Sequence, residues 1–375
     1  MSNTPETTET ETTVDEQRAA LADAFDRELD PLAEFAPTFD AAEFDPFDLF
    51  MEERIEPRDL TEHTRTTYRR VFKQWRGYMD EQDRHPACPS ESHVKGFISH
   101  LRDHYGNQSR TIKMKLQKLG SAYEYWQEDA AFPHKQDYNP ITSAKEKVSL
   151  DPPAIKEPPR LPVEELRDML ADVKHIRERA VIATQLKLGL RATETCNIQL
   201  ADVGIQSTEL REHYPDLGTN PRLDGHENAV CIPHDREGNK SKRPRVLPLD
   251  DELRRVILRY LLGRPDASTP WLFLSPERHE QLRGRDVNDV WKDHFHPEYA
   301  ETDEHRAVTS HFGRHRFTTF WRVEQDTPRE LVKYMRGDKP GAGAHEDRGG
   351  IDHYIHSYYD DIEDLYRENI YRLGI

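Results

Sequence analysis

Long apolar runs are missing from this 375-residue sequence, in which only 35% of the residues are hydrophobic. A helix that crosses a bilayer needs about 20 mostly apolar residues, and no run of even about 18 occurs here. The N-terminal residues MSNTPETTETETTVDEQ contain neither the basic nor the apolar region of a signal peptide. We therefore expect a cytoplasmic protein without a membrane partner.

Cysteine is also scarce, and Cys88, Cys196 and Cys231 stand far apart in unrelated surroundings. Three separate thiols supply neither a disulfide framework nor the paired spacing of a zinc site. Histidine is more frequent, but no pair has the spacing of a zinc hydrolase. The sequence thus predicts a protein of a reducing compartment, with no metal and no other cofactor.

A net basic charge, which is typical of nucleic-acid-binding proteins, is absent, since the chain carries a net charge of −17. Residues 1–50 hold 14 acidic and 2 basic residues, so the rest, with 56 acidic and 51 basic residues, has a net charge of only −5. Local potential decides binding, so this body can still present a basic groove. Acid-rich surfaces also keep proteins hydrated in concentrated salt, and we interpret the excess as a sign of a halophilic archaeal source.

The first part of the chain is expected to contain an arm and an all-helical domain. Residues 1–55 predict an acidic, largely disordered arm with one amphipathic helix over 15–35, either a solvated tail or a DNA-mimicking arm. Residues 56–141 predict three helices, and Asn139-Pro140 is expected to close the domain. These helices begin near Leu60, cover 91–105 and begin at Ser109.

A linker and a second domain complete the chain. Residues 142–162 lack periodicity and are rich in proline, which predicts an extended linker. Residues 163–375 combine a buried helix over 177–190 with β-like runs around 226–249. Further helices are expected at 250–262, 284–295, 312–324, 328–336 and about 351–372. The predicted fold is mainly α with a small antiparallel β-sheet, an α+β domain following an all-helical one.

Basic residues gather on two helices of the first domain, although the whole chain is acidic. Charge runs usually mark a solvated helix face, but the stretch 110–118 contains no acid at all. We expect DNA-phosphate contacts from these helices and from bases beside a turn of the second domain. The candidates are Arg65, Arg69, Lys73, Arg110, Lys113, Lys115 and Lys118, then Lys242, Arg243 and Arg245.

Three short segments carry groups suited to a phosphodiester. In GLRATE, Arg191 follows an apolar helix and can bind two phosphate oxygens, and Glu194 is close enough to orient it. Lys240, near a turn, can grip a phosphate or donate a proton to a leaving alkoxide. His311 and Arg314 share a helix face and can bind one phosphate together. Each segment alone also fits an ordinary surface pair or a capping histidine.

A cluster of tyrosines follows in DHYIHSYYDD at 352–361. A tyrosine hydroxyl can attack phosphorus, but its pKa of about 10 requires cationic neighbours and a base. Aromatic residues at helical spacing are usually core, so at most one of Tyr354, Tyr358, Tyr359 and Tyr366 is expected to be catalytic.

The order of these parts resembles the tyrosine recombinase, or phage integrase, family over about residues 57–372. The first domain resembles its helical, SAM-like core-binding domain. The resemblance implies that Arg191, Lys240, His311 and Arg314 are catalytic. It implies further that Tyr354, in Tyr354-Ile355-His356, is the nucleophile, with Tyr358 and then Tyr359 as alternatives. Such enzymes cut and rejoin double-stranded DNA through a 3′-phosphotyrosyl intermediate as homotetramers, and the residues beyond Tyr359 are then candidates for packing against a neighbouring subunit.

One position departs from the family pattern. Where the family has His or Trp before the nucleophile, this chain has Asp338, followed by an insertion at 339–350. His345 or His353 could supply the missing group. The departure keeps two alternatives open: a catalytically impaired DNA-binding protein of the same fold, and a type IB topoisomerase-like activity.

Overall fold

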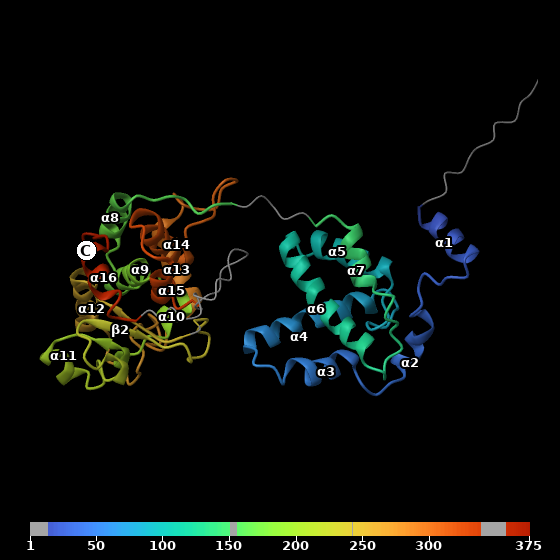
Figure 1. The fold of residues 1–375 in the computed structure, drawn as a ribbon, viewed down its shortest axis with the longest axis horizontal. Helices are drawn as coiled ribbons and strands as arrows, with labels where there is room; N and C mark the ends of the chain where they lie inside the picture. Colours follow the sequence, from blue (N-terminus) through green and yellow to red (C-terminus); the bar gives the residue numbers. More distant parts are fainter. Residues whose placement is uncertain (1–13, 151–155, 242, 339–357) are drawn as a thin grey trace, which may run out of the picture. The chain divides into compact units, whose positions relative to one another are not determined.

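The computed structural model describes residues 14–150, 156–241, 243–338 and 358–375. The chain divides into two compact units, Met1–Ile155 and Lys156–Ile375 (Figure 1). Both are mainly helical, and the second contains a small antiparallel sheet, which confirms the predicted fold class. None of the helices in the described ranges is both long and apolar enough to cross a membrane.

The first unit is built around three long helices. They are α4 (Glu62–Asp80), α5 (Glu91–Asp103) and α6 (Ser109–Glu128). The hydroxyls of Thr61 and Ser90 accept the N–H groups of Thr64 and His93 in the first turns of α4 and α5, which explains where these two helices begin. Apolar side chains at three-to-four spacing, among them Trp75, Phe97 and Trp126, form one core. The three predicted helices are therefore present, with starts within about two residues of the expected ones.

The expectation of a largely disordered arm over 1–55 is wrong for its second half. After α1 (Val14–Ala24), which lies in the first half, the second half forms η1 (Ala33–Phe35), α2 (Ala36–Asp40), α3 (Pro46–Phe50) and the π-helical η2 (Met51–Ile55). Leu32, Phe47, Phe50 and Met51 are buried in the core of the first unit. The acidic average of the segment hid these apolar residues, whose spacing is helical.

The expected boundaries of the linker also need correction. Asn139-Pro140 begins a helix, α7 (Pro140–Lys147), because the Asn139 side chain accepts the N–H of Thr142 and proline suits the first helical position. Ile141 is buried, so this helix belongs to the first unit. On the other side Leu161 packs in the core of the second unit. The boundary between the units therefore lies at residues 155–156.

The second unit surrounds one buried helix, α9 (Ile176–Leu188), with a three-stranded sheet and further helices. The strands pair antiparallel in the order β1 (Val203–Gly204), β2 (Ala229–Ile232), β3 (Arg245–Pro248). The helices are α8 (Val163–Asp172), α10 (Ala192–Cys196), α11 (Thr208–His213), α12 (Asp251–Gly263), α13 (Gly284–Phe295), α14 (Ser310–Thr319), α15 (Arg329–Arg336) and α16 (Glu363–Asn369), with short η3 (Leu200–Asp202), η4 (Pro221–Leu223) and η5 (Phe320–Glu324). Helices α12, α13 and α14 pack directly on α9, and α10 follows it, so residues at the end of α9 are held from several sides.

In the single chain, the C-terminal segment that was a candidate for packing against a neighbouring subunit packs within its own unit. The buried Tyr366 and Tyr371 donate their hydroxyls to the carbonyls of Lys187 and Leu186 on α9. The Lys187 ammonium is fully buried 2.6 Å from both Asp250 and Glu252. Glu252 in turn accepts the N–H of Leu373 at 2.7 Å. These paired charges and bonds tie the chain end to the centre of the unit.

Candidate active site

Arg191 lies at the junction of α9 and α10. Helix α9 ends at Gly189 with φ +63°, and a Cβ at this glycine would lie 2.5 Å from the ring of Phe317. Only glycine fits there, for conformation and for space. Arg191 then caps α10, where its N–H donates to the Glu194 carboxylate at 2.8 Å. Its guanidinium projects toward the surface with a quarter of the side chain exposed.

The buried carboxylate of Glu194 is the centre of the site. It accepts the hydroxyl of Ser241 at 2.7 Å and lies 3.3 Å from guanidinium nitrogens of Arg191 and Arg245 and 3.8 Å from one of Arg314. Burial alone would raise the pKa of Glu194, but Arg245 and Arg314 lower it to about 2. This carboxylate is therefore ionised at neutral pH and orients the surrounding arginines.

Arg314, on α14, is almost completely buried, and both of its terminal nitrogens are already engaged. Nη1 donates to the carbonyl of Gly189 at 2.8 Å. Nη2 donates to the carbonyl of Arg336 at 3.0 Å and to Asp338 at 2.9 Å. Burial and then the nearby Arg191 lower the pKa of Arg314 to about 9, so the guanidinium stays charged at neutral pH.

His311 lies one helical turn before Arg314, at the exposed edge of α14. Partial burial, together with His315, Arg314 and Arg191, lowers the pKa of His311 to about 4. The imidazole is therefore neutral at pH 7. Its ring lies 4.5 Å from the ring of His315. A neutral imidazole beside two guanidinium groups can accept a proton or hydrogen-bond a phosphate.

Lys240 is exposed in the connection between β2 and β3. The base of this connection is fixed, because Asn239 donates to the carbonyl of Pro233 at 2.7 Å and Asn197 donates to Asn239 at 2.9 Å. Within the described residues the Lys240 ammonium has no hydrogen bond or ion pair, so it is available to a ligand. The next residue, Ser241, reaches Glu194 and links this connection to the arginines.

The candidate nucleophiles differ in whether the structure describes them and in how exposed they are. Tyr354 lies outside the described residues, as do His345, His353 and Lys242. Tyr358 is exposed. Tyr359 is buried, and its hydroxyl bonds Glu363 at 2.9 Å and Arg367 at 3.3 Å; burial and the bond to Glu363 raise its pKa. The geometry of Tyr359 therefore disfavours it as a nucleophile.

Two of the expected DNA contacts are wrong. Arg245 is buried, where it pairs with Glu194 and donates to the carbonyl of Met335 at 2.8 Å. Lys115 is only 7% exposed, because it shares the inward face of α6 with Ile112 and Leu119. Neither residue can lie on a DNA-binding surface in this fold.

The remaining expected DNA contacts lie at or near the surface. Arg69, Lys73, Arg110 and Lys113 are exposed. Arg65, Lys118 and Arg243 are half-buried, with Lys118 3.7 Å from the ring centre of Tyr68 and Arg243 5.0 Å from that of Tyr334. Arg69 is also ion-paired with Glu56 and Glu62. The described part of the first unit therefore presents bases on α4 and α6 that face solvent.

Sequence reasoning missed two members of the site, Arg336 and Ser241, and gave Arg245 a different role. Arg336 lies 2.9 Å from Asp338 and supplies the carbonyl that Arg314 holds. Ser241 binds Glu194 from the β2–β3 connection, and Arg245 binds it from the start of β3. The only sequence signal for them is their proximity to Lys240 and Asp338, the positions already singled out.

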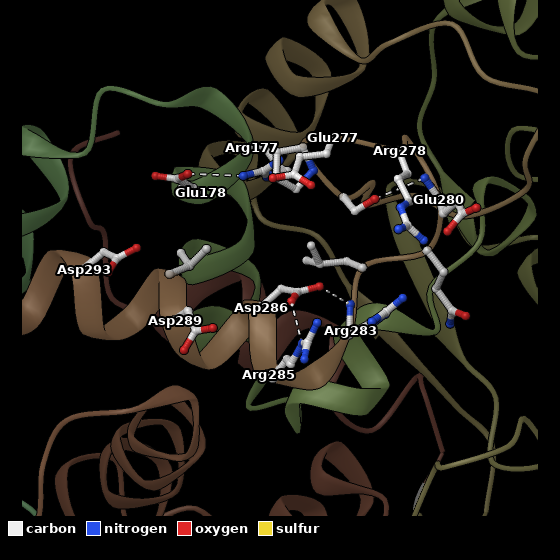
Figure 2. Close-up of a pocket in the computed structure, with 15 residues that line it drawn as sticks. Arg177, Glu178, Glu277, Arg278, Glu280, Arg283, Arg285, Asp286, Asp289 and Asp293 are labelled. Carbon is white, nitrogen blue, oxygen red and sulfur yellow. Dashed lines mark hydrogen bonds and ion pairs between the residues drawn. The ribbon is translucent and has the colours of Figure 1, made fainter.

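A separate pocket of the second unit lies along α13 (Figure 2). It has a volume of about 520 Å³ and is lined by Arg177, Arg278, Arg283 and Arg285, but also by at least as many carboxylates. Arg177 lies 3.2 Å from Glu178, and Arg285 lies 3.4 Å from Asp286. Because its charges compensate one another, this pocket does not have the cationic character that a phosphate requires.

Comparison with known proteins decides the family. The sequence model of the phage integrase family matches residues 159–360, which is more than half of the chain. This chain belongs to the phage integrase family. A tyrosine recombinase of Caldanaerobacter subterraneus, TTE1313, is 25% identical over 171 residues, 42% of this chain and 53% of that protein. The phage integrase chain described here thus spans about half the length of that relative.

Solved integrase structures share the fold. The Tn1549 transposon integrase in complex with transposon right end DNA is 18% identical, with a TM-score of 0.55 over 86% of this chain and 98% of that chain. A lambda integrase dimer bound to a COC′ core site is 12% identical, with a TM-score of 0.56 over 89% and 90%. At such identities the similarity establishes the integrase fold and nothing finer.

Proposed function

We propose that this protein is a site-specific DNA recombinase that cuts and rejoins DNA through a 3′-phosphotyrosyl intermediate. The observation that carries the proposal is the convergence of Arg191 and Arg314 on the buried carboxylate of Glu194. A single anchored carboxylate holds the partly exposed guanidinium of Arg191 beside the buried guanidinium of Arg314. Two such groups match the oxygens of a phosphodiester and the charge that develops on them in the transition state.

The remaining groups have roles in one balanced displacement. The hydroxyl of Tyr354 attacks phosphorus, and the bond from phosphorus to the 5′ oxygen breaks. Neutral His311 accepts the proton that the tyrosine hydroxyl loses, and Lys240 donates a proton to the leaving 5′ oxygen. The 5′ hydroxyl of a partner strand then reverses the step. Because the phosphotyrosyl bond preserves the energy of the phosphodiester, neither a nucleotide nor a metal is consumed.

The proposed partners are double-stranded DNA and further copies of the chain. The lambda integrase is described as a tetramer bound to a Holliday junction, and the Tn1549 integrase as a complex with DNA. We propose the same kind of assembly here, a homotetramer on two DNA sites. Because the C-terminal segment packs within its own unit, contacts between the copies must come from other surfaces or from an exchange of this segment.

Asp338 favours a second candidate, a DNA-binding protein of this fold with impaired catalysis. A carboxylate replaces the His or Trp of the family pattern and lies beside both arginines. Negative charge at this place opposes phosphate binding. A type IB topoisomerase-like activity would instead show cleavage without sequence preference.

Covalent trapping tests the proposal. Nicked suicide duplexes from the genomic neighbourhood are incubated with the protein in concentrated salt, and a denaturing gel detects protein joined to one strand. We expect a band that Tyr354→Phe abolishes and Tyr359→Phe retains. Loss of the band in Tyr358→Phe, with the band retained in Tyr354→Phe, would identify Tyr358 as the nucleophile. Binding of these duplexes without any covalent band would favour the impaired DNA-binding protein.

A further inference from the structure

A single carboxylate, that of Asp338, contacts three guanidinium groups at the open edge of the site. Oδ1 lies 2.9 Å from Nη2 of Arg314 and 3.5 Å from Nη2 of Arg191. Oδ2 lies 2.9 Å from Nε of Arg336. These contacts place one oxygen between the two arginines to which the proposed function assigns the scissile phosphate.

The backbone fixes this position. Helix α15 ends in a Schellman motif, in which Asp338 N–H donates to the carbonyl of Lys333 at 3.0 Å and Gly337 N–H to that of Tyr334 at 2.9 Å. Gly337 has φ +68°, and a Cβ there would lie 2.4 Å from a nitrogen of Arg245. The end of α15, which packs against Arg245 at the centre of the site, therefore holds Asp338 beside the arginines.

The two carboxylates of the site have different surroundings. Glu194 lies behind the arginines with no exposed side-chain surface, whereas the Asp338 side chain is 28% exposed. The terminal nitrogens of Arg314 otherwise hold the carbonyls of Gly189 and Arg336. The direction that Asp338 occupies is thus the one from which a ligand can reach Arg314.

We infer that Asp338 occupies the place of a DNA phosphate between Arg191 and Arg314, so that DNA must displace this carboxylate to be bound and cleaved. This inference rests on the proposed function for the identity of the ligand. The geometry alone supports a more general statement. The Asp338 carboxylate competes with a phosphate dianion or diester for the two arginines. Removing the negative charge of Asp338 should strengthen phosphate binding at the site by roughly fivefold to tenfold.

The first test needs no DNA. The melting temperature is compared in potassium phosphate and in potassium chloride of equal ionic strength, for the full chain and for Asp338→Asn. A ligand that binds only the folded state raises the melting temperature. We expect a larger phosphate-dependent rise in Asp338→Asn than in the unmodified chain, and loss of that extra rise in Asp338→Asn/Arg191→Ala. Asp251→Asn is the matched control, because it removes an equal charge from an exposed carboxylate on α12. An equal rise in the unmodified chain and in Asp338→Asn overturns the inference.

The second test uses a duplex that gives a covalent band, with both Tyr354 and Tyr358 replaced by Phe so that only binding is measured. We expect Asp338→Asn to bind it more tightly, and the gain to vanish when the scissile phosphate is replaced by an uncharged methylphosphonate. Equal gain on both duplexes overturns the inference. If the Asp338→Asn variant folds poorly, both tests are repeated with Asp338→Ser. A protein that forms no covalent band on any duplex contradicts the proposed function, and the phosphate test still decides the role of Asp338.

Discussion

Among individual residues, Glu194 illustrates how a buried charge organises a surface site. Its carboxylate has no exposed side-chain surface and faces Arg191, Arg245 and Arg314. A charge in such a place is tolerated only because it is paired and hydrogen-bonded. The same pairing prevents the three guanidinium groups from moving apart, so stability and phosphate binding depend on one side chain.

Glu194→Gln should therefore destabilise the second unit strongly. The substitution leaves the fully buried Arg245 without its counter-charge, and breaking a buried pair in this way costs about 3–5 kcal/mol. Urea denaturation measures the free energy of unfolding. Glu164→Gln is the control, because Glu164 is largely exposed beside Arg167 and should change stability by less than about 1 kcal/mol. Equal effects of the two substitutions would contradict the role given to Glu194.

His311 should make the fold sensitive to acid. Its pKa in the folded protein is about 4, below its ordinary value of 6.5. Partial burial lowers this pKa most, and the neighbouring His315 and three arginines, Arg314, Arg191 and Arg336, lower it further. Between these values the unfolded chain binds more protons, so stability falls as the pH drops from about 6.5 to 4. His311→Gln should reduce this loss by at most about 1 kcal/mol, since the ring is partly solvated. Denaturation at pH 4.5 and 7 measures it, and an equal reduction in His63→Gln, an exposed residue of the first unit, would contradict the assignment.

At the level of helices and strands, periodic segments could be predicted from sequence and long-range partners could not. Helices α4 and α5 follow from apolar spacing and a capping hydroxyl, α6 from apolar spacing and α9 from its apolar run, all of which are local properties. Arg245 was predicted to contact DNA because it follows a basic turn, yet its partner Glu194 is 51 residues away in sequence. Asn139-Pro140 carries the signals of both a stop and a start, and only packing shows that the helix continues the first unit.

The basic face of the first unit gives a prediction about α6. Lys113 is exposed, whereas Lys115 is 7% exposed and lies 5.5 Å from the ring centre of Tyr105. Lys113→Gln should lower the slope of DNA affinity against salt concentration by about 1, as expected for one lost phosphate contact. Lys115→Gln should leave that slope unchanged. A larger change of slope in Lys115→Gln would show that the DNA-binding face lies elsewhere.

For the molecule as a whole, the unexpected result is where the first unit begins. Its core includes Leu32, Phe47, Phe50 and Met51, although the surrounding composition suggested a tail. The buried Trp126 also donates its ring N–H to the carbonyl of Pro46 at 3.2 Å. An acidic average over 50 residues thus concealed about half a dozen core positions, which is why composition alone misplaced this boundary.

Two shortened chains test this boundary. Removal of residues 1–27 deletes the partly exposed ion pair of Arg18 with Glu91 and no buried apolar side chain of the described residues, and it should leave the melting temperature nearly unchanged. Removal of residues 1–51 deletes four large buried apolar side chains, each worth about 1.5–3 kcal/mol, and should unfold the first unit. Circular dichroism distinguishes the two. Because the second unit is also helical, a helical signal as large as that of the chain without residues 1–27 would restore the view of this segment as an arm. Only the shorter deletion is suited to asking whether the acidic residues compete with DNA.

The most direct measurement is mass spectrometry of the protein after trapping on a nicked duplex. The arrangement of Arg191, Arg314, His311 and Lys240 predicts a nucleotide joined to the peptide that contains Tyr354, and Arg191→Ala should abolish this adduct. A nucleotide on a tyrosine outside 354–359, or an adduct that persists unchanged in Arg191→Ala, would contradict a phosphotyrosyl mechanism at this site.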